Sequence, residues 1–163
     1  FFILKMNIPA KIKPFFYKKK IKTGDNIIIQ GKIICCSCSD FYVLYYGNEK
    51  KVFGRKKLYA NDNGLILVLV CRKCDREIEL FNNHINISHF HQEKKTDNSL
   101  PPLKKLICDN CACSSFNVDV TYEYPNERIL DEYDNEDDFT WLWINLKCNN
   151  CRRILRRFVD IEM

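Results

Sequence analysis

Four pairs of cysteines with the same spacing constrain this chain more than any other feature of its sequence. The pairs are Cys35 with Cys38, Cys71 with Cys74, Cys108 with Cys111, and Cys148 with Cys151. Two thiolates separated by two residues can bind one ion, and a closed tetrahedral site needs four sulfur ligands. The four pairs therefore supply the ligands for two such sites.

The order of the pairs along the chain predicts how they group. Residues 35–81 and 108–161 each read as a pair, a strand, a loop, a strand, a second pair and a last strand, and similar intervals, thirty-two and thirty-six residues, separate the two pairs. This internal repeat favours one site in each half. The expected ligands are Cys35, Cys38, Cys71 and Cys74 for one ion, and Cys108, Cys111, Cys148 and Cys151 for the other. Exchange of ligands between the halves is the alternative, and it requires the two modules to interleave.

The ligand type indicates the metal. A closed site of four soft thiolates favours zinc, so we expect two structural Zn²⁺ ions. A disulfide scaffold is one alternative for ten cysteines, but eight of the ten fall into four identical spacings. Iron of the rubredoxin kind is a second alternative, disfavoured because no pair is followed by Gly. Residues 1–16 contain three lysines and no apolar signal-peptide core, so we expect a cytoplasmic protein, with Met6 as a candidate start.

Two cysteines and three histidines fall outside the repeated pattern. Cys36 and Cys113 offer an alternative Cys-x-Cys arrangement of ligands, but each half already has four cysteines at the more favourable spacing. We therefore expect Cys36 and Cys113 to be small, partly buried thiols without a role. His84, His89 and His91 have no cysteine or carboxylate pattern beside them, so we expect a solvated linker in preference to a third metal site.

Hydrophobic periodicity predicts strands in both halves. Apolar and polar residues alternate strictly over Phe116–Tyr124, which places one face of a strand in a core. Leu65–Val70 is a continuous apolar run that follows a turn, as in a strand buried on both faces. In Phe139–Lys147, Trp141 and Trp143 share one face and aliphatic residues share the other. The second and third of these strands run directly into cysteine pairs.

These patterns predict an all-β chain with four segments. They are a basic N-terminal segment (1–24), a first antiparallel module (25–83), a linker (84–102) and a second module (103–163). Modules of about 50 residues bury little apolar surface. A structural zinc ion contributes roughly 10–16 kcal/mol of apparent binding free energy. We therefore expect folding to depend on the metal. No run of about 18 apolar residues indicates a membrane span.

Charge is distributed unevenly. Residues 1–60 contain thirteen Lys or Arg against three Asp or Glu, whereas residues 114–147 contain two against nine. Eight thiolates with two dications add −4 to the formal charge of +5, so the loaded protein is close to neutral and the basic residues beside the pairs chiefly offset site charge. A basic and aromatic surface in the first half remains a candidate nucleic-acid site. Its residues are Lys18, Lys19, Lys20, Lys50, Lys51, Arg55, Lys56 and Lys57.

Catalytic motifs are missing from the sequence. It contains no nucleophile elbow, no phosphate-binding glycine loop and no histidine pair at helical spacing. A site closed by four cysteines leaves no position open for water or substrate. A redox CxxC would open a helix, whereas strand-like residues follow these pairs. We therefore expect no enzymatic activity.

Two stretches carry a resemblance to known proteins. Leu67–Phe81 (LVLVCRKCDREIELF) and Phe139–Glu162 (FTWLWINLKCNNCRRILRRFVDIE) resemble zinc-ribbon proteins, in particular small bacterial proteins with paired CxxC modules and no established activity. The resemblance covers roughly residues 33–162 and implies two tandem zinc-ribbon-like modules, each closed by one ion. The two-ribbon arrangement is also similar to small RNA polymerase subunits and transcript-cleavage factors, and Asp131–Glu132 resembles the acidic hairpin of the latter. The intervals between the pairs are longer here.

Two functional hypotheses follow from the sequence. The first is a non-enzymatic structural-zinc protein that recognises another protein through an exposed sheet edge or hairpin. The second is a nucleic-acid-binding or transcription-associated double zinc ribbon that uses the basic first half.

Overall fold

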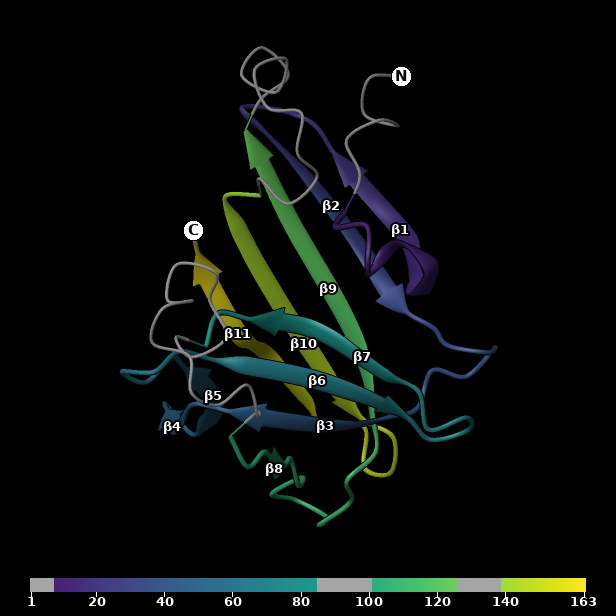
Figure 1. Cartoon of the computed structure of the whole chain (residues 1–163), viewed down its shortest axis with the longest axis vertical. Helices are drawn as coiled ribbons and strands as arrows, with labels where there is room; N and C mark the ends of the chain where they lie inside the picture. The colour runs from purple at the N-terminus through teal and green to yellow at the C-terminus, as the bar shows by residue number, and fades with distance from the viewer. Residues whose placement is uncertain (1–7, 85–100, 126–138) are drawn as a thin grey trace, which may run out of the picture.

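The computed structural model describes residues 8–84, 101–125 and 139–163, and these form β-strands without an α-helix (Figure 1). The all-β prediction is therefore confirmed. Among the described residues, no helix has the length and hydropathy that a membrane crossing requires.

Nine strands belong to one antiparallel sheet, and two form a separate hairpin. In chain order the strands are β1 (Phe16–Lys22), β2 (Asn26–Ile33), β3 (Phe41–Tyr46), β4 (Asn48–Val52), β5 (Arg55–Tyr59), β6 (Ile66–Cys71), β7 (Glu77–Asn82), β8 (Lys104–Lys105), β9 (Phe116–Pro125), β10 (Trp141–Cys148) and β11 (Ile154–Glu162). The main path of the sheet is β1-β2-β9-β3-β6-β7. β9 also pairs with β10, and β10 pairs with β11. β8 pairs with β3, and β4 and β5 form a separate two-stranded sheet.

The predicted strands are present where their periodicity placed them. On β9 and β10, residues alternate between the core and the opposite face, with Trp141 and Trp143 on the outer side. On β6, residues on both faces are buried except Val70. A turn closed by Asn61 and Gly64 precedes β6. The strands β6 and β10 each end on the first cysteine of a pair, as expected.

Two three-stranded units, β3-β6-β7 and β9-β10-β11, meet at a corner of the sheet. Phe41 lies opposite Cys71 in the first unit, Phe116 lies opposite Cys148 in the second, and the two phenylalanines lie opposite each other. Figure 1 shows β3, β6 and β7 running across β9 and β10. Buried residues from both units form one hydrophobic cluster. The units therefore pack as crossed layers that share a single core.

The sheet also continues across the predicted module boundaries. β2, from the first predicted module, pairs with β9, from the second, over residues 26–32 and 119–125. β1, from the predicted N-terminal segment, pairs with β2, and the ring of Phe16 crosses Gly31 so closely that a Cβ there would lie 2.4 Å from it. Most of the predicted linker lies outside the described residues. The predicted N-terminal segment and the two predicted modules thus share one sheet.

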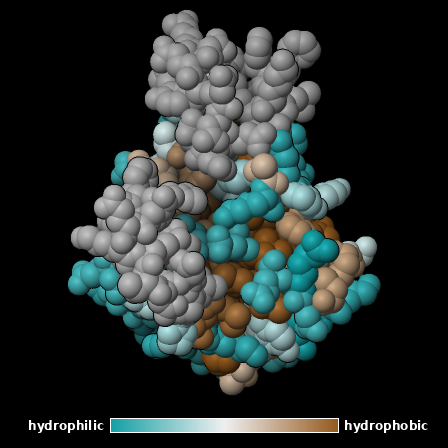
Figure 2. Space-filling model, in the orientation of Figure 1, coloured by the Kyte–Doolittle hydropathy of each residue, from teal (hydrophilic) through white to brown (hydrophobic). Residues whose placement is uncertain are grey.

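The prediction for His84 is wrong. His84 was expected in a solvated linker, but it is buried, with 3% of its surface exposed, and its ring packs edge-on against Tyr46 at 5.1 Å. His89 and His91 lie outside the described residues. Figure 2 shows hydrophobic side chains reaching the surface over β6 and β7, bordered by hydrophilic ones.

Candidate metal centre

The second half of the chain brings together the four cysteines that the sequence grouped there. The Sγ atoms of Cys108, Cys111, Cys148 and Cys151 all lie within 4.8 Å of one another. The Sγ–Sγ distance is 3.6 Å from Cys108 to Cys151 and 3.5 Å from Cys111 to Cys148. Sulfurs bonded to one tetrahedral zinc at about 2.3 Å stand roughly 3.8 Å apart, whereas a disulfide brings them to about 2.05 Å. The spacing fits four ligands around one ion.

The first half contains a similar group with one different member. It consists of Cys35, Cys36, Cys71 and Cys74, with Sγ–Sγ distances of 3.5 Å from Cys35 to Cys74 and 3.7 Å from Cys36 to Cys71. Cys36 thus takes the place that the spacing gave to Cys38. The two groups of four cysteines could each hold a metal ion. Each group stays within its own half of the chain, although the sheet does not.

The turn at the first pair explains the exchange of Cys38 for Cys36. Cys35 and Cys38 close a tight hairpin by two backbone hydrogen bonds, of 2.9 Å and 2.7 Å. The two residues at its tip, Cys36 and Ser37, both have positive φ, 45° and 64°, as a two-residue hairpin of type I′ requires. Cys36 contacts Cys71 from this tip. Beyond the tip, Cys38 accepts a hydrogen bond from the backbone N–H of Asp40 at 3.4 Å instead.

The other three pairs share a different turn, in which both cysteines of the pair join the group. The residue four positions after the first cysteine donates its N–H back to the carbonyl of that cysteine: Asp75 to Cys71, Ala112 to Cys108, and Arg152 to Cys148, at 2.8–3.0 Å. Those three donors have φ values of 61°, 62° and 69°. The wider turn leaves room for two sulfurs on the same side, which the tight hairpin does not.

A signal for Cys36 was present in the sequence. Residues 36–41 read CSCSDF and residues 111–116 read CACSSF, so alignment on Phe41 and Phe116 matches Cys36 with Cys111. The structure follows this alignment, because Cys38 and Cys113 behave alike. The sulfur of each accepts the N–H two residues on, from Asp40 and Ser115, at 3.4 Å. Sequence reasoning missed the match because it aligned the halves on the CxxC spacing and not on the strand that follows.

Each group contains thiols whose pKa values are shifted in opposite directions. Burial acts to raise the pKa of Cys71, but backbone N–H groups of Cys74 and Lys73 outweigh it and hold that pKa at about 6. Hydrogen bonds from the Asn110 side chain and the Arg153 backbone lower the pKa of Cys151 to about 6. Burial raises the pKa of Cys35 and of Cys148 to about 12. The pKa of Cys36 is raised as well, to about 11, mainly by burial, and hydrogen bonds lower the pKa of Cys111. Each group therefore contains at least one thiol that ionises readily and at least one that needs a cation to ionise.

Asn149 links the two metal groups. Its side-chain Nδ2 donates to Asp40 Oδ1 at 2.8 Å and to Ser115 Oγ at 2.7 Å, and its backbone N–H donates to Ser115 O at 3.0 Å. Asp40 in turn accepts the backbone N–H of Arg72 at 3.1 Å. Asn149 lies inside the fourth cysteine pair, Asp40 follows the first, and Arg72 lies inside the second. Hydrogen bonds beyond the cysteines thus hold the turns of both groups in place.

Lys56 was predicted as a nucleic-acid contact, and its position argues against that role. It is 8% exposed, and its Nζ lies 2.9 Å from Asp109 and 3.1 Å from Glu49. It also donates to the carbonyl of Ile107 at 3.2 Å. Asp109 lies between Cys108 and Cys111, so Lys56 fastens the β4–β5 hairpin to the second metal group and is not available to phosphates.

The remaining predicted basic residues occupy two separate surfaces. Lys18, Lys19 and Lys20 are exposed on β1. Lys50, Lys51, Arg55 and Lys57 belong to the β4–β5 hairpin. Figure 1 places β1 and this hairpin on opposite sides of the view. The structure does not bring the predicted set together as one site.

Comparison of the chain with protein-family models, with curated proteins and with solved structures found no match. The predicted resemblance at Asp131–Glu132 falls outside the described residues.

Proposed function

We propose that the chain is a non-enzymatic protein whose two groups of four cysteines hold structural zinc ions. The sulfur-only donor sets and their separations of 3.5–3.7 Å support this proposal. Four protein ligands complete a tetrahedral site and leave no position for a reacting water. Each ion would join the turn of one hairpin, β6–β7 or β10–β11, to the turn that precedes another strand, β3 or β9. The crossed layers of the fold meet at these turns.

We further propose that this scaffold binds another protein through the tip of the β4–β5 hairpin. The observation that carries the proposal is Phe53, which is 99% exposed between Val52 and Arg55, the last pair of the hairpin. Phe53 has φ 52° and Gly54 has φ 76°. Turns of this kind favour Asn-Gly, and a bulky residue held at positive φ costs on the order of 1–3 kcal/mol. A fully exposed ring kept at such a cost suits insertion into a partner.

The hairpin is presented rigidly, which supports a role in recognition. Lys56 anchors β5 to Asp109 near the second metal group, and Tyr45 donates a hydrogen bond to Glu49 on β4. Basic side chains surround the tip, which favours an acidic rim on the partner. They are Lys50, Lys51, Arg55 and Lys57.

Affinity capture from the native cell with the zinc-loaded full chain tests the hairpin proposal. Three baits are compared: wild type, Phe53→Ser, and Tyr17→Ser as a control, since Tyr17 is a 65% exposed ring on β1. We expect a protein that wild type and Tyr17→Ser retain and that Phe53→Ser loses. The same proteins on all three baits would contradict the proposal.

Elemental analysis of the reduced protein tests the metal proposal separately. We expect two equivalents of zinc per chain, and no metal or a single equivalent would contradict it.

A second candidate function, nucleic-acid binding, is favoured by one observation. A basic groove lies on the outer face of the sheet, away from the hairpin, and it is lined by residues from both halves of the chain.

A further inference from the structure

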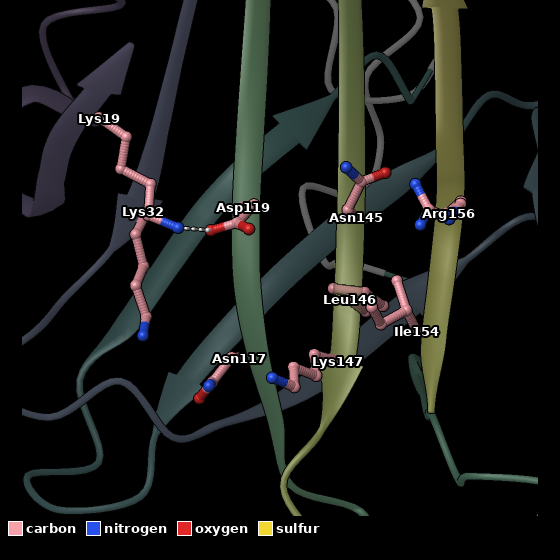
Figure 3. Close-up of a pocket in the computed structure, with 9 residues that line it drawn as sticks. All are labelled: Lys19, Lys32, Asn117, Asp119, Asn145, Leu146, Lys147, Ile154 and Arg156. Carbon is pink, nitrogen blue, oxygen red and sulfur yellow. Dashed lines mark ion pairs between the residues drawn. The ribbon is translucent and has the colours of Figure 1, made fainter. Parts of the chain in front are cut away.

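The groove lies across β1, β2, β9, β10 and β11 and has a volume of about 280 Å³ (Figure 3). Four of its lining side chains are cationic and one is a carboxylate. They are Lys19, Lys32, Lys147, Arg156 and Asp119. Of these residues only Lys19 belongs to the basic surface predicted from the sequence. The groove as a whole was not predicted, because its residues come from five strands that lie up to 137 positions apart, from Lys19 to Arg156.

Strand register explains why these side chains meet. On β9, Phe116, Val118 and Val120 point into the core, so Asn117 and Asp119 face outward. Lys32 on β2 lies opposite Asp119, and Lys147 on β10 lies opposite Asn117. Figure 3 shows Asn117 between Lys32 and Lys147.

The groove has an excess of positive charge. Lys19 lies 3.7 Å from Asp119, the ion pair drawn in Figure 3, and this pair cancels one cation. Lys32, Lys147 and Arg156 have no ion pair with any other described residue. Three uncompensated cations around one concave surface favour an anionic ligand with more than one negative group.

Polar and aromatic groups continue from the groove along the same face. Asn117, which lines the groove, carries a buried Oδ1 that has no hydrogen-bond partner among the described residues. On β10, Trp141, Trp143 and Asn145 share this face, and the centroids of the two tryptophan rings lie 6.0 Å apart. The guanidinium of Arg157 lies 4.5 Å from the centroid of the Trp143 ring. Stacked bases commonly lie against such rings and guanidinium planes.

We propose that this groove binds single-stranded nucleic acid, with phosphates at Lys32, Lys147 and Arg156 and a base near Trp143 and Arg157. An acidic peptide would use the cations but would leave the rings unused. The proposal gives the nucleic-acid candidate function a surface and a ligand. It does not depend on the Phe53 hairpin, so capture of a protein by that hairpin can fail while the groove still binds.

The experiment titrates the zinc-loaded full chain with oligothymidylate and oligouridylate of about 16 nucleotides and follows tryptophan fluorescence and anisotropy. The chain has two tryptophans, Trp141 and Trp143, and both lie on this face, so binding should quench their emission. Three phosphate contacts at a slope of about −0.7 each predict that affinity falls roughly 20-fold between about 50 and 200 mM salt.

Matched double variants locate the binding. Lys32→Gln with Arg156→Gln removes two groove charges, and we expect the salt slope to fall from about −2 to about −0.7. Lys50→Gln with Lys57→Gln removes the same charge from the β4–β5 hairpin and should bind like wild type. Both variants must retain two equivalents of metal and the emission of the free wild-type protein.

Three results would overturn the proposal. They are the lack of oligonucleotide binding by wild type, an equal loss of binding in both double variants, and binding of polyglutamate to the groove as tight as that of the oligonucleotides.

Discussion

Replacement of Cys36 or Cys38 by Ser distinguishes the ligand set that the structure indicates from the one that the cysteine spacing predicts. Both residues lie in the same turn, Cys36 five positions before Phe41 and Cys38 three positions before it. The CxxC spacing predicts that Cys38→Ser destroys the first metal site and that Cys36→Ser is nearly silent. The structure predicts the reverse, because the Sγ of Cys36 lies 3.7 Å from that of Cys71 within the sulfur group.

The magnitudes follow from what each sulfur contacts. If a structural zinc site contributes roughly 10–16 kcal/mol, each of four thiolates contributes on average about 3 kcal/mol. Cys36→Ser should therefore weaken zinc binding at the first site about 100-fold. Cys38 contributes one long hydrogen bond from the N–H of Asp40, which a serine oxygen can also accept, so its replacement should cost under about 1 kcal/mol.

Competition with a chromophoric chelator measures both effects in the full chain. Wild type and Cys38→Ser should resist the chelator at two sites, and Cys36→Ser should resist it at one. Cys113→Ser is the matched control, since Cys113 occupies the corresponding place beside the second group and accepts the N–H of Ser115. Loss of tight zinc in Cys38→Ser with retention in Cys36→Ser would refute the assignment of ligands.

Two further predictions concern protons and packing. At pH 7 the thiols of Cys35 and Cys148, whose pKa values are raised to about 12, must release protons when zinc binds, whereas Cys71 and Cys151, with pKa values of about 6, are already thiolates. Calorimetry in buffers of different ionisation enthalpy should therefore show more protons released per zinc below pH 6 than at pH 7, and equal numbers would contradict the pKa pattern. Gly31→Ala places a methyl group 2.4 Å from the Phe16 ring and 2.7 Å from the carbonyl oxygen of Tyr17, so it should destabilise the zinc-loaded protein by about 1–3 kcal/mol in urea unfolding. Gly24→Ala, which meets nothing within 4 Å, is its control, and equal midpoints for the two variants would count against the packing argument.

The sequence predicted features that depend on local patterns. Alternation of apolar and polar residues placed β9 and the two faces of β10, and the apolar run before Cys71 placed β6. Such patterns are reliable because burial of one face of a strand is a property of consecutive residues. The second sulfur group was likewise predicted residue by residue, since its two turns are both wide.

Features that depend on backbone direction or on distant register needed the tertiary structure. The spacing of two cysteines states how far apart they lie along the chain, but the turn between them decides which sulfur faces the group, and a type I′ hairpin selected Cys36 over Cys38. Lys56 looked like an exposed base in sequence and is buried because Asp109, fifty-three positions later, folds against it.

Local periodicity and cysteine content were enough to predict an all-β chain with two sulfur groups, one in each half. The shared sheet and the groove with its four basic side chains could not be predicted in this way, because they depend on the pairing of β2 and β10 with β9, which joins residues far apart in the chain. That pairing is set by the burial of the common core between the crossed layers, which no single segment encodes.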